Sequence, residues 1–85
     1  MGLIAQVVPV EELDAIAMNV VRDVCKSSPV AVRQAKKAMD ATFGVALEDG
    51  IELEHDAWKV VIASEDRSEG IAAFNEKRDP NWNNR

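Results

Sequence analysis

Apolar residues recur at helical spacing through most of this chain. Between positions 13 and 24 they follow the three- and four-residue intervals that place side chains on one face of a helix, namely Leu13, Ile16, Ala17, Val20, Val21 and Val24. Acidic residues at positions 11, 12 and 14 suit the positive end of a helix dipole, and Lys26 suits its negative end. The pattern predicts an amphipathic helix after Pro9.

A second helix is predicted from about 29 to 42. Ser28 is a favoured N-cap residue, and Pro29 fits the first helical position because an N–H there would have no partner within the helix. Gly44 is suited to end this helix, since glycine readily takes the left-handed conformation found just beyond helix ends.

A third helix is predicted from about 46 to 63, and a fourth follows it. The third has a broad apolar face made of Leu47, Ile51, Trp58, Val61 and Ile62. The pair Asp49-Gly50 leaves open a turn near its beginning. Ser64 is placed to cap the fourth helix, in which Ile71 and Phe74 lie three apart on one side. The ending DPNWNNR has the composition of a loop.

The first residues form the one segment with strand character. LIAQVV, positions 3 to 8, is apolar and β-prone, but no second such segment occurs with which it could pair. The predicted fold is therefore mainly α, with about four helices and one short N-terminal strand or extended segment. We divide the chain into this N-terminal segment, 1–9, and a helical domain, 10–85.

Charge excludes some classes of partner. The chain has 85 residues, of which 47% are apolar, and a net charge of −5 with a pI near 4.7. This balance opposes general binding to nucleic acid or to anionic membranes, both of which favour positive proteins. The opening GLIAQVVPV is too short for a membrane span and has no basic n-region, so we expect a soluble, cytoplasmic protein.

The sequence contains no recognisable catalytic or metal-binding set. Glu52 and His55 lie three apart, as in carboxylate di-metal bundles, but His55 is the single histidine, which favours a solvated acidic face. The lone Cys25 lies beside an apolar stripe and is predicted to be a buried thiol. No cofactor and no metal are expected.

Two groups of positive residues have alternative interpretations. Three cations on the second helix, Arg33, Lys36 and Lys37, favour a solvated basic face over DNA binding, since the chain is acidic overall. Phe74 and Lys77, three apart near the end of the fourth helix, place an aromatic ring beside an ammonium group. Spacing alone leaves two functions open: packing with helix-dipole complementarity, or contact with a phosphate-bearing nucleotide.

Four pieces of the sequence together resemble the C-terminal segment of the enoyl-CoA hydratase/isomerase (crotonase) family. They occur in family order: GLIAQVVPVEEL, SSPVAVRQAKKAM, LEDGIELEHDAW and SEDRSEGIAAFNEKRDPNW. The resemblance covers almost the whole chain. The last piece is the most specific, because its SED, EG, AF and EKR elements match together with an aromatic residue after the proline, although Trp82 stands where phenylalanine is more usual.

The resemblance implies that these residues are a part of an enzyme that does not include the catalytic groups. In the family, a spiral of strands and helices carries the oxyanion hole and the catalytic carboxylates, and neither is expected within these residues. No residue here is therefore assigned a catalytic role, and whether the chain is an enzyme is left open, with the chain alone predicted to be inactive. Residues 1–9 would be the end strand or connector of that spiral.

The resemblance also implies partners and site residues. The C-terminal helices of the family mediate trimer formation and help to close the acyl-CoA site. Lys77 falls on a position that approaches the CoA phosphates, Phe74 on one that walls the CoA moiety, and Arg78 is expected to be a structural ion-pair partner. We expect a homo-oligomer or association with a crotonase catalytic core, acyl-CoA binding only in the complete enzyme, and no nucleic acid or membrane partner. The alternative is a stand-alone helical oligomerisation or interaction module.

Overall fold

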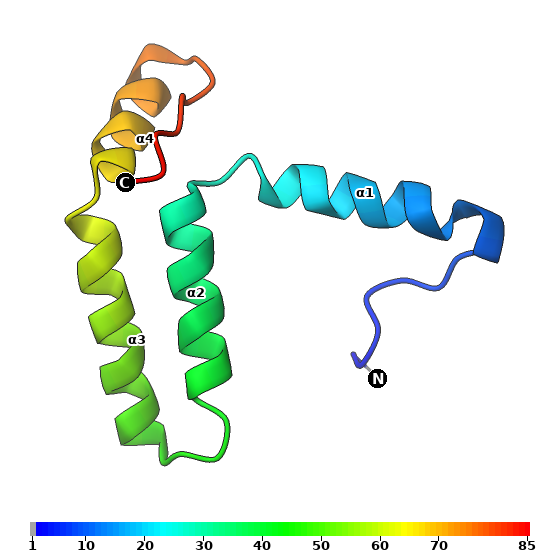
Figure 1. Ribbon diagram of the computed structural model, residues 1–85, viewed down its shortest axis with the longest axis horizontal. Helices are drawn as coiled ribbons and strands as arrows, with labels where there is room; N and C mark the ends of the chain where they lie inside the picture. Colours follow the sequence, from blue (N-terminus) through cyan, green and yellow to red (C-terminus); the bar gives the residue numbers. More distant parts are fainter. Residues whose placement is uncertain (1) are drawn as a thin grey trace.

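Helices account for most of the described chain, residues 2–85, in the computed structural model (Figure 1). A short 3₁₀ turn, η1 (Val10–Glu12), leads directly into α1 (Leu13–Val24), which is followed by α2 (Pro29–Ala41), α3 (Leu47–Ile62) and α4 (Glu65–Glu76). The mainly helical class predicted from the sequence is confirmed. None of the helices in residues 2–85 is long and apolar enough to cross a membrane.

The predicted helix ends are present in the structure. The Ser28 Oγ accepts a hydrogen bond from the Ala31 N–H at 3.4 Å, and the Ser64 Oγ accepts one from the Arg67 N–H at 3.2 Å. Each hydroxyl satisfies a backbone donor that the first turn of its helix leaves without a partner. Gly44 has a left-handed backbone with φ +77° and lies two residues beyond the cap residue of α2, Thr42.

The alternative turn at Asp49-Gly50 is not formed. α3 begins at Leu47 and passes through both residues, with Glu48 and Asp49 in its first turn, where the helix dipole favours carboxylates. Gly50 is buried, and a Cβ atom added there would lie 3.3 Å from the Thr42 Cγ2. The glycine therefore allows the start of α3 to approach the end of α2 closely.

The apolar N-terminal segment does not form a strand, and no strand is present within residues 2–85. A strand requires a neighbour to accept and donate ladder hydrogen bonds. None of the described segments offers such an edge, so the apolar character of residues 3–8 has nothing to pair with. Leu3 and Val7 are each 85% exposed.

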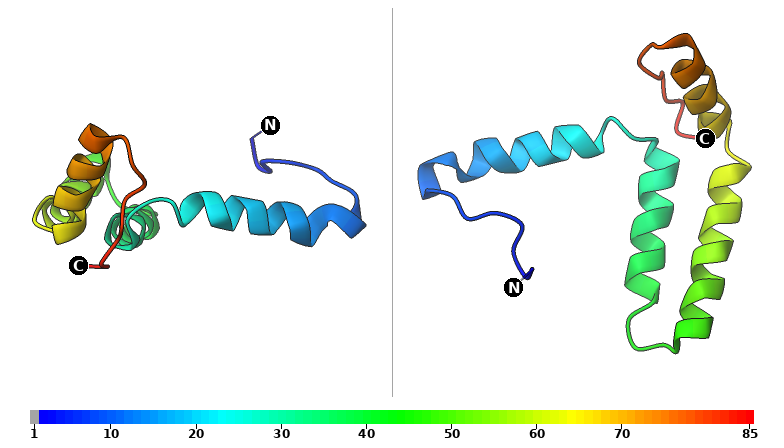
Figure 2. Two further views of the ribbon diagram at one scale, coloured as in Figure 1. Left: turned by 90° about the horizontal axis from the view of Figure 1, so that it is seen from above. Right: turned by 180° about the vertical axis from the view of Figure 1, so that it is seen from behind.

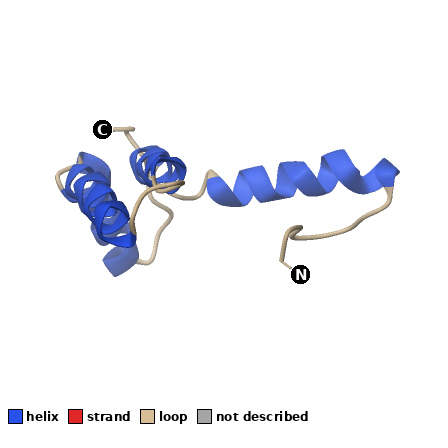
Figure 3. Ribbon diagram, turned by 90° about the horizontal axis from the view of Figure 1, so that it is seen from below, coloured by secondary structure: helices blue, strands red, loops and turns tan. Residues whose placement is uncertain are grey.

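The helices form an open arrangement (Figures 1 and 2). α2 and α3 run side by side as an antiparallel pair, α4 continues from the end of α3, and α1 extends away from all three. The radius of gyration is 16.1 Å, against roughly 12 Å for a compact domain of this length. Figure 3 shows the same separation from below, with α1 joined to the other helices by a loop.

The open arrangement leaves the apolar face of α1 uncovered. Leu13, Val20 and Val21 are 54%, 59% and 49% exposed. The prediction that Cys25 is a buried thiol is wrong, because it lies at the end of α1 and is exposed. The apolar stripe beside it has no partner within residues 2–85, so no side chain covers the sulfur.

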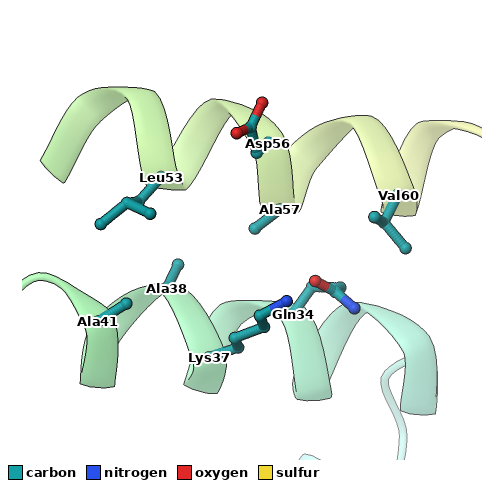
Figure 4. Close-up of a pocket in the computed structure, with 8 residues that line it drawn as sticks. All are labelled: Gln34, Lys37, Ala38, Ala41, Leu53, Asp56, Ala57 and Val60. Atoms are coloured by element: carbon teal, nitrogen blue, oxygen red, sulfur yellow. The ribbon is translucent and has the colours of Figure 1, made fainter. Parts of the chain in front are cut away.

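Small side chains bring α2 and α3 together. Ala38 and Ala57 point toward one another across the pair (Figure 4). Beside them lies a groove of about 240 Å³, lined by Gln34, Lys37, Ala38, Ala41, Leu53, Asp56, Ala57 and Val60. Leu53 and Val60 remain 39% and 48% exposed, so the pair contributes little enclosed core.

Candidate functional site

The end of α4 differs from the helix predicted to run through Lys77. The helix ends at Glu76, and Lys77 has a left-handed backbone with φ +55° and ψ +43°. The Arg78 N–H donates to the Ala73 carbonyl at 3.1 Å and the Lys77 N–H donates to the Phe74 carbonyl at 3.3 Å. These two bonds form a Schellman motif, in which glycine is the usual left-handed residue. We call residues 73–78 the Lys77 turn.

The left-handed conformation changes the expected relation between the two candidate CoA-binding residues. Helical spacing would align Phe74 with Lys77, but Lys77 lies outside the helix, so that alignment does not apply. Both side chains are nevertheless exposed at the same helix end, and Phe74 is 84% exposed. The aromatic ring and the lysine side chain are both exposed and remain available to a ligand.

Arg78 is an ion-pair partner, as expected from the resemblance. Its Nη1 and Nη2 donate to Oε1 and Oε2 of Glu69 at 2.6 and 3.1 Å, and its Nε donates to Glu76. Glu69 Oε1 also accepts the Asn81 N–H at 2.7 Å. The Arg78 guanidinium and then the Asn81 N–H lower the pKa of Glu69 to about 2, and both carboxylates raise the pKa of Arg78.

Asp66 is the most deeply buried charged residue of the described chain, with 1% of its surface exposed. Its Oδ2 accepts the Ser28 hydroxyl at 2.7 Å, and its Oδ1 accepts the N–H groups of Asn83 and Asn84 at 2.8 and 3.1 Å. Burial raises the pKa of this carboxyl, but these hydrogen bonds outweigh burial and the pKa is lowered. Asp66 thus joins the starts of α2 and α4 to the C-terminal tail.

Trp82 supplies a third attachment of the tail. Its Nε1 donates to the Lys26 carbonyl at 3.0 Å, in the loop between α1 and α2. The indole ring lies over Gly70, where an added Cβ would be 3.2 Å from the ring atom Cη2. A tryptophan is therefore accommodated at this position because residue 70 has no side chain.

Sequence reasoning missed the roles of Asp66 and Glu69. By its position, Asp66 is only a carboxylate in the first turn of α4, where it complements the helix dipole. A signal was available in the spacing, since Asp66, Glu69 and Gly70 are three and four apart and so lie on one face of α4. The partner of that face is the tail, which helical periodicity cannot identify.

The other candidates from the sequence are not brought into one site. His55 lies against Trp58, with ring centroids 5.8 Å apart, and no group of three potential metal ligands occurs within residues 2–85. On α2, the Lys36 Nζ pairs with the Asp40 Oδ2 at 3.2 Å. Both features are consistent with solvated helix surfaces.

Comparison with known proteins identifies the family. The sequence model of the enoyl-CoA hydratase/isomerase family matches residues 1–85. The chain belongs to the enoyl-CoA hydratase/isomerase family. A probable mitochondrial enoyl-CoA hydratase of Dictyostelium discoideum is 37% identical over 84 residues, which cover 99% of this chain and 30% of that protein. The 2,3-dehydroadipyl-CoA hydratase of Escherichia coli K12 is 34% identical, with 99% and 33% covered.

Solved structures of the enoyl-CoA hydratase/isomerase family agree with this arrangement of helices. The enoyl-CoA hydratase of Bacillus anthracis superposes with a TM-score of 0.92 at 38% identity, over 99% of this chain and 33% of that one. The chain thus spans about a third of the length of its relatives. The open packing of the helices is shared with family members rather than peculiar to this sequence.

Proposed function

We propose that this chain is the C-terminal part of an enoyl-CoA hydratase/isomerase and contributes subunit assembly and part of the acyl-CoA binding wall. The catalytic groups then belong to a core outside these residues. The observation that carries the proposal is the end of α4, where exposed Phe74 and Lys77 offer an aromatic surface and a cation. CoA presents a nucleotide and phosphates, which suit these two groups.

The assembly role rests on the uncovered apolar faces. α1 exposes valine and leucine side chains along its length, and Met39 on α2 and Trp58 on α3 are 61% and 53% exposed. Patches of this kind in a family member mark contacts with other subunits or with the rest of the protein.

In the same proposal the protein is cytoplasmic and acts on fatty acyl-CoA esters. Cell fractionation would test the location, and substrate profiling would test the substrate class.

The 85 residues alone are expected not to hydrate crotonyl-CoA. No catalytic set was recognised among them, and the oxyanion-hole donors that stabilise an enolate-like state are assigned to the core. The test is hydration of crotonyl-CoA followed by absorbance. Turnover that survives removal of contaminating enzymes would refute this part of the proposal.

Lys77 provides the direct test of the binding role. In a family enzyme that carries residues 1–85 as its matching segment, Lys77→Ala should weaken CoA affinity by about 1 to 3 kcal/mol, the range for charge-assisted hydrogen bonds. Lys59→Ala is the control, because Lys59 is an exposed lysine that pairs with Asp56 on α3. Calorimetric affinities that are equal for the two variants would assign Lys77 to structure alone.

A second candidate is a stand-alone helical oligomerisation or interaction module without catalytic activity. The uncovered face of α1 favours this candidate as well, since an unpartnered amphipathic helix can pair with a second copy. Light scattering of the chain across a concentration series distinguishes the two. A single defined dimer, trimer or hexamer would favour the module, whereas polydisperse association would favour a part that needs its core.

A further inference from the structure

Besides the packing of the Trp82 ring over Gly70, the C-terminal tail is held to α4 by polar contacts. We use the word clasp for the tail residues 78–84 together with the two carboxylates that hold them, Asp66 and Glu69. Glu69 binds Arg78 and the Asn81 N–H, and Asp66 binds the N–H groups of Asn83 and Asn84. The tail returns along α4, as Figures 1 and 2 show.

Few other contacts hold α4 in place. The buried residues of this helix are Asp66 and Ala73, which are 1% and 2% exposed, while Ile71 and Phe74 are 50% and 84% exposed. A helix without a buried apolar face gains little from packing. The position of the end of α4 therefore depends on the tail and its hydrogen bonds.

Glu69 binds Arg78, the last residue of the Lys77 turn, and Asn81 back to α4. One oxygen of its carboxylate accepts from both Arg78 and Asn81, and the other accepts from Arg78. Residue 77 thus lies between the last turn of α4 and residues 78–81, which Glu69 binds back to the same helix. A left-handed lysine costs free energy that glycine would avoid, and such a conformation persists where its surroundings over-determine it.

We propose that the clasp holds Lys77 in its left-handed conformation, and that Glu69 is a positioning residue for the anion contact made by Lys77. The ligand class is the phosphate of a CoA ester, so the second half of this inference rests on the proposed function. The first half concerns the chain alone. The two halves have separate measurements, and their failures are distinguishable.

The first experiment is amide hydrogen exchange on the 85-residue chain. The N–H groups of Arg78, Asn81, Asn83 and Asn84 should be protected, because each donates within the turn or to a clasp carboxylate. Glu69→Gln should lower protection at Arg78 and Asn81 by about 10-fold, the effect of losing hydrogen bonds to a charged group. Glu65→Gln is the matched control, because Glu65 lies on the same helix and its exposed pair with Arg85, at the end of the tail, contributes little and does not involve the Lys77 turn.

Lys77→Gly separates positioning from general stability. Glycine removes the cost of the left-handed conformation. In the double variant Glu69→Gln/Lys77→Gly, the Arg78 amide should therefore recover protection several-fold, whereas the Asn81 amide should not. Absence of protection at the four amides in the unaltered chain would overturn the clasp. Equal losses in the Glu69→Gln and Glu65→Gln variants, or no recovery at Arg78, would overturn the role of Glu69.

The second experiment uses a family enzyme that carries residues 1–85 as its matching segment. Glu69→Gln should raise KM for crotonyl-CoA several-fold with kcat unchanged, and this effect should disappear in a Lys77→Ala background. If Lys77→Ala alone leaves KM unchanged, the proposed function fails while the exchange data still test the clasp. If Lys77→Ala raises KM and Glu69→Gln does not, the positioning role fails.

Discussion

At position 77, the left-handed backbone conformation and the proposed function of the side chain favour different residue types. Its backbone ends α4 in a left-handed conformation, for which glycine is best suited, while its ammonium group is the candidate contact for a phosphate. Lysine at this position therefore costs stability that a glycine would not. The presence of a long cation at a glycine-type position is an argument for a function of the side chain.

The backbone cost can be measured with two variants that remove the same charge. Lys77→Gly should give a free energy of unfolding higher than that of Lys77→Ala by about 1 kcal/mol, because only glycine enters the left-handed region without a Cβ penalty. Urea denaturation followed by the fluorescence of the two tryptophans, Trp58 and Trp82, measures the difference. Equal stability of the two variants would mean that Lys77 is not left-handed in solution.

The lowered pKa of Glu69 predicts how the free energy of unfolding depends on pH. Its pKa is about 2 in the folded chain, below its ordinary value of 4.5, chiefly because Arg78 and the Asn81 N–H favour the charged form. The folded state therefore binds a proton less readily than the unfolded state in this range. The stabilisation is fully present above about 4.5 and is lost as the pH falls toward about 2.

Denaturation profiles between these pH values test the assignment. Glu69→Gln should flatten the acid limb, whereas Glu65→Gln should leave it nearly unchanged, since Glu65 forms an exposed pair. Asp66 also has a lowered pKa, so part of the slope should remain in the Glu69 variant. An unchanged slope after Glu69→Gln would contradict the ion pair with Arg78.

At the scale of elements, a single hydroxyl connects α2 to α4. Ser28 Oγ accepts the Ala31 N–H at the start of α2 and donates to the buried Asp66 carboxylate on α4. Ser64 caps α4 through an equivalent bond to Arg67, but its own proton goes to the nearby Val61 carbonyl. The two caps are therefore matched in their local role and differ in the long-range bond.

Substitution of both caps measures that difference. Ser64→Ala should lower the free energy of unfolding by about 1 kcal/mol, the usual cost of losing an N-cap. Ser28→Ala should cost more, because it also removes a donor from a buried carboxylate. Ser28→Thr keeps the hydroxyl, so its free energy of unfolding should lie close to that of the unaltered chain. Equal effects of the two alanine variants in urea denaturation would argue against the bond between α2 and α4.

At the scale of the whole molecule, an extended shape and uncovered apolar helices occur together. The chain measures 42 by 40 by 18 Å, and α1 has no helix of residues 2–85 packed along it. An isolated helix of this length is marginal in water and is stabilised by a partner for its apolar face. The shape therefore suits a segment that wraps against other protein surfaces.

Self-association of the chain is the expected consequence. Light scattering should give a mass that rises with concentration, because the α1 face can be covered by a second copy. Val20→Lys on that face should reduce the association, whereas Asn19→Lys, which adds the same charge at a neighbouring polar position of α1, should not. A monomer at all concentrations would contradict the interpretation of α1 as an assembly surface.

Local features of the candidate site could be predicted from the sequence, and its arrangement could not. Residue types and spacing, together with the family resemblance, indicate Phe74 and Lys77, but they do not predict the left-handed turn at Lys77. A lysine in a Schellman motif has no sequence signal as strong as glycine. Cys25 was expected to be buried because an apolar stripe predicts a covered face, yet nothing in the described chain covers it.

The sequence by itself determined the helices and their starts. Helical periodicity, the serines at 28 and 64 and the proline at 29 act within a few residues, so their effects follow from local spacing. The tertiary structure alone decided how the tail uses Asp66, Glu69 and Gly70, whose partners are distant in the sequence, such as Asn84, 18 residues from Asp66. Such contacts depend on where the chain returns in space, and a periodic pattern along one helix carries no information about that.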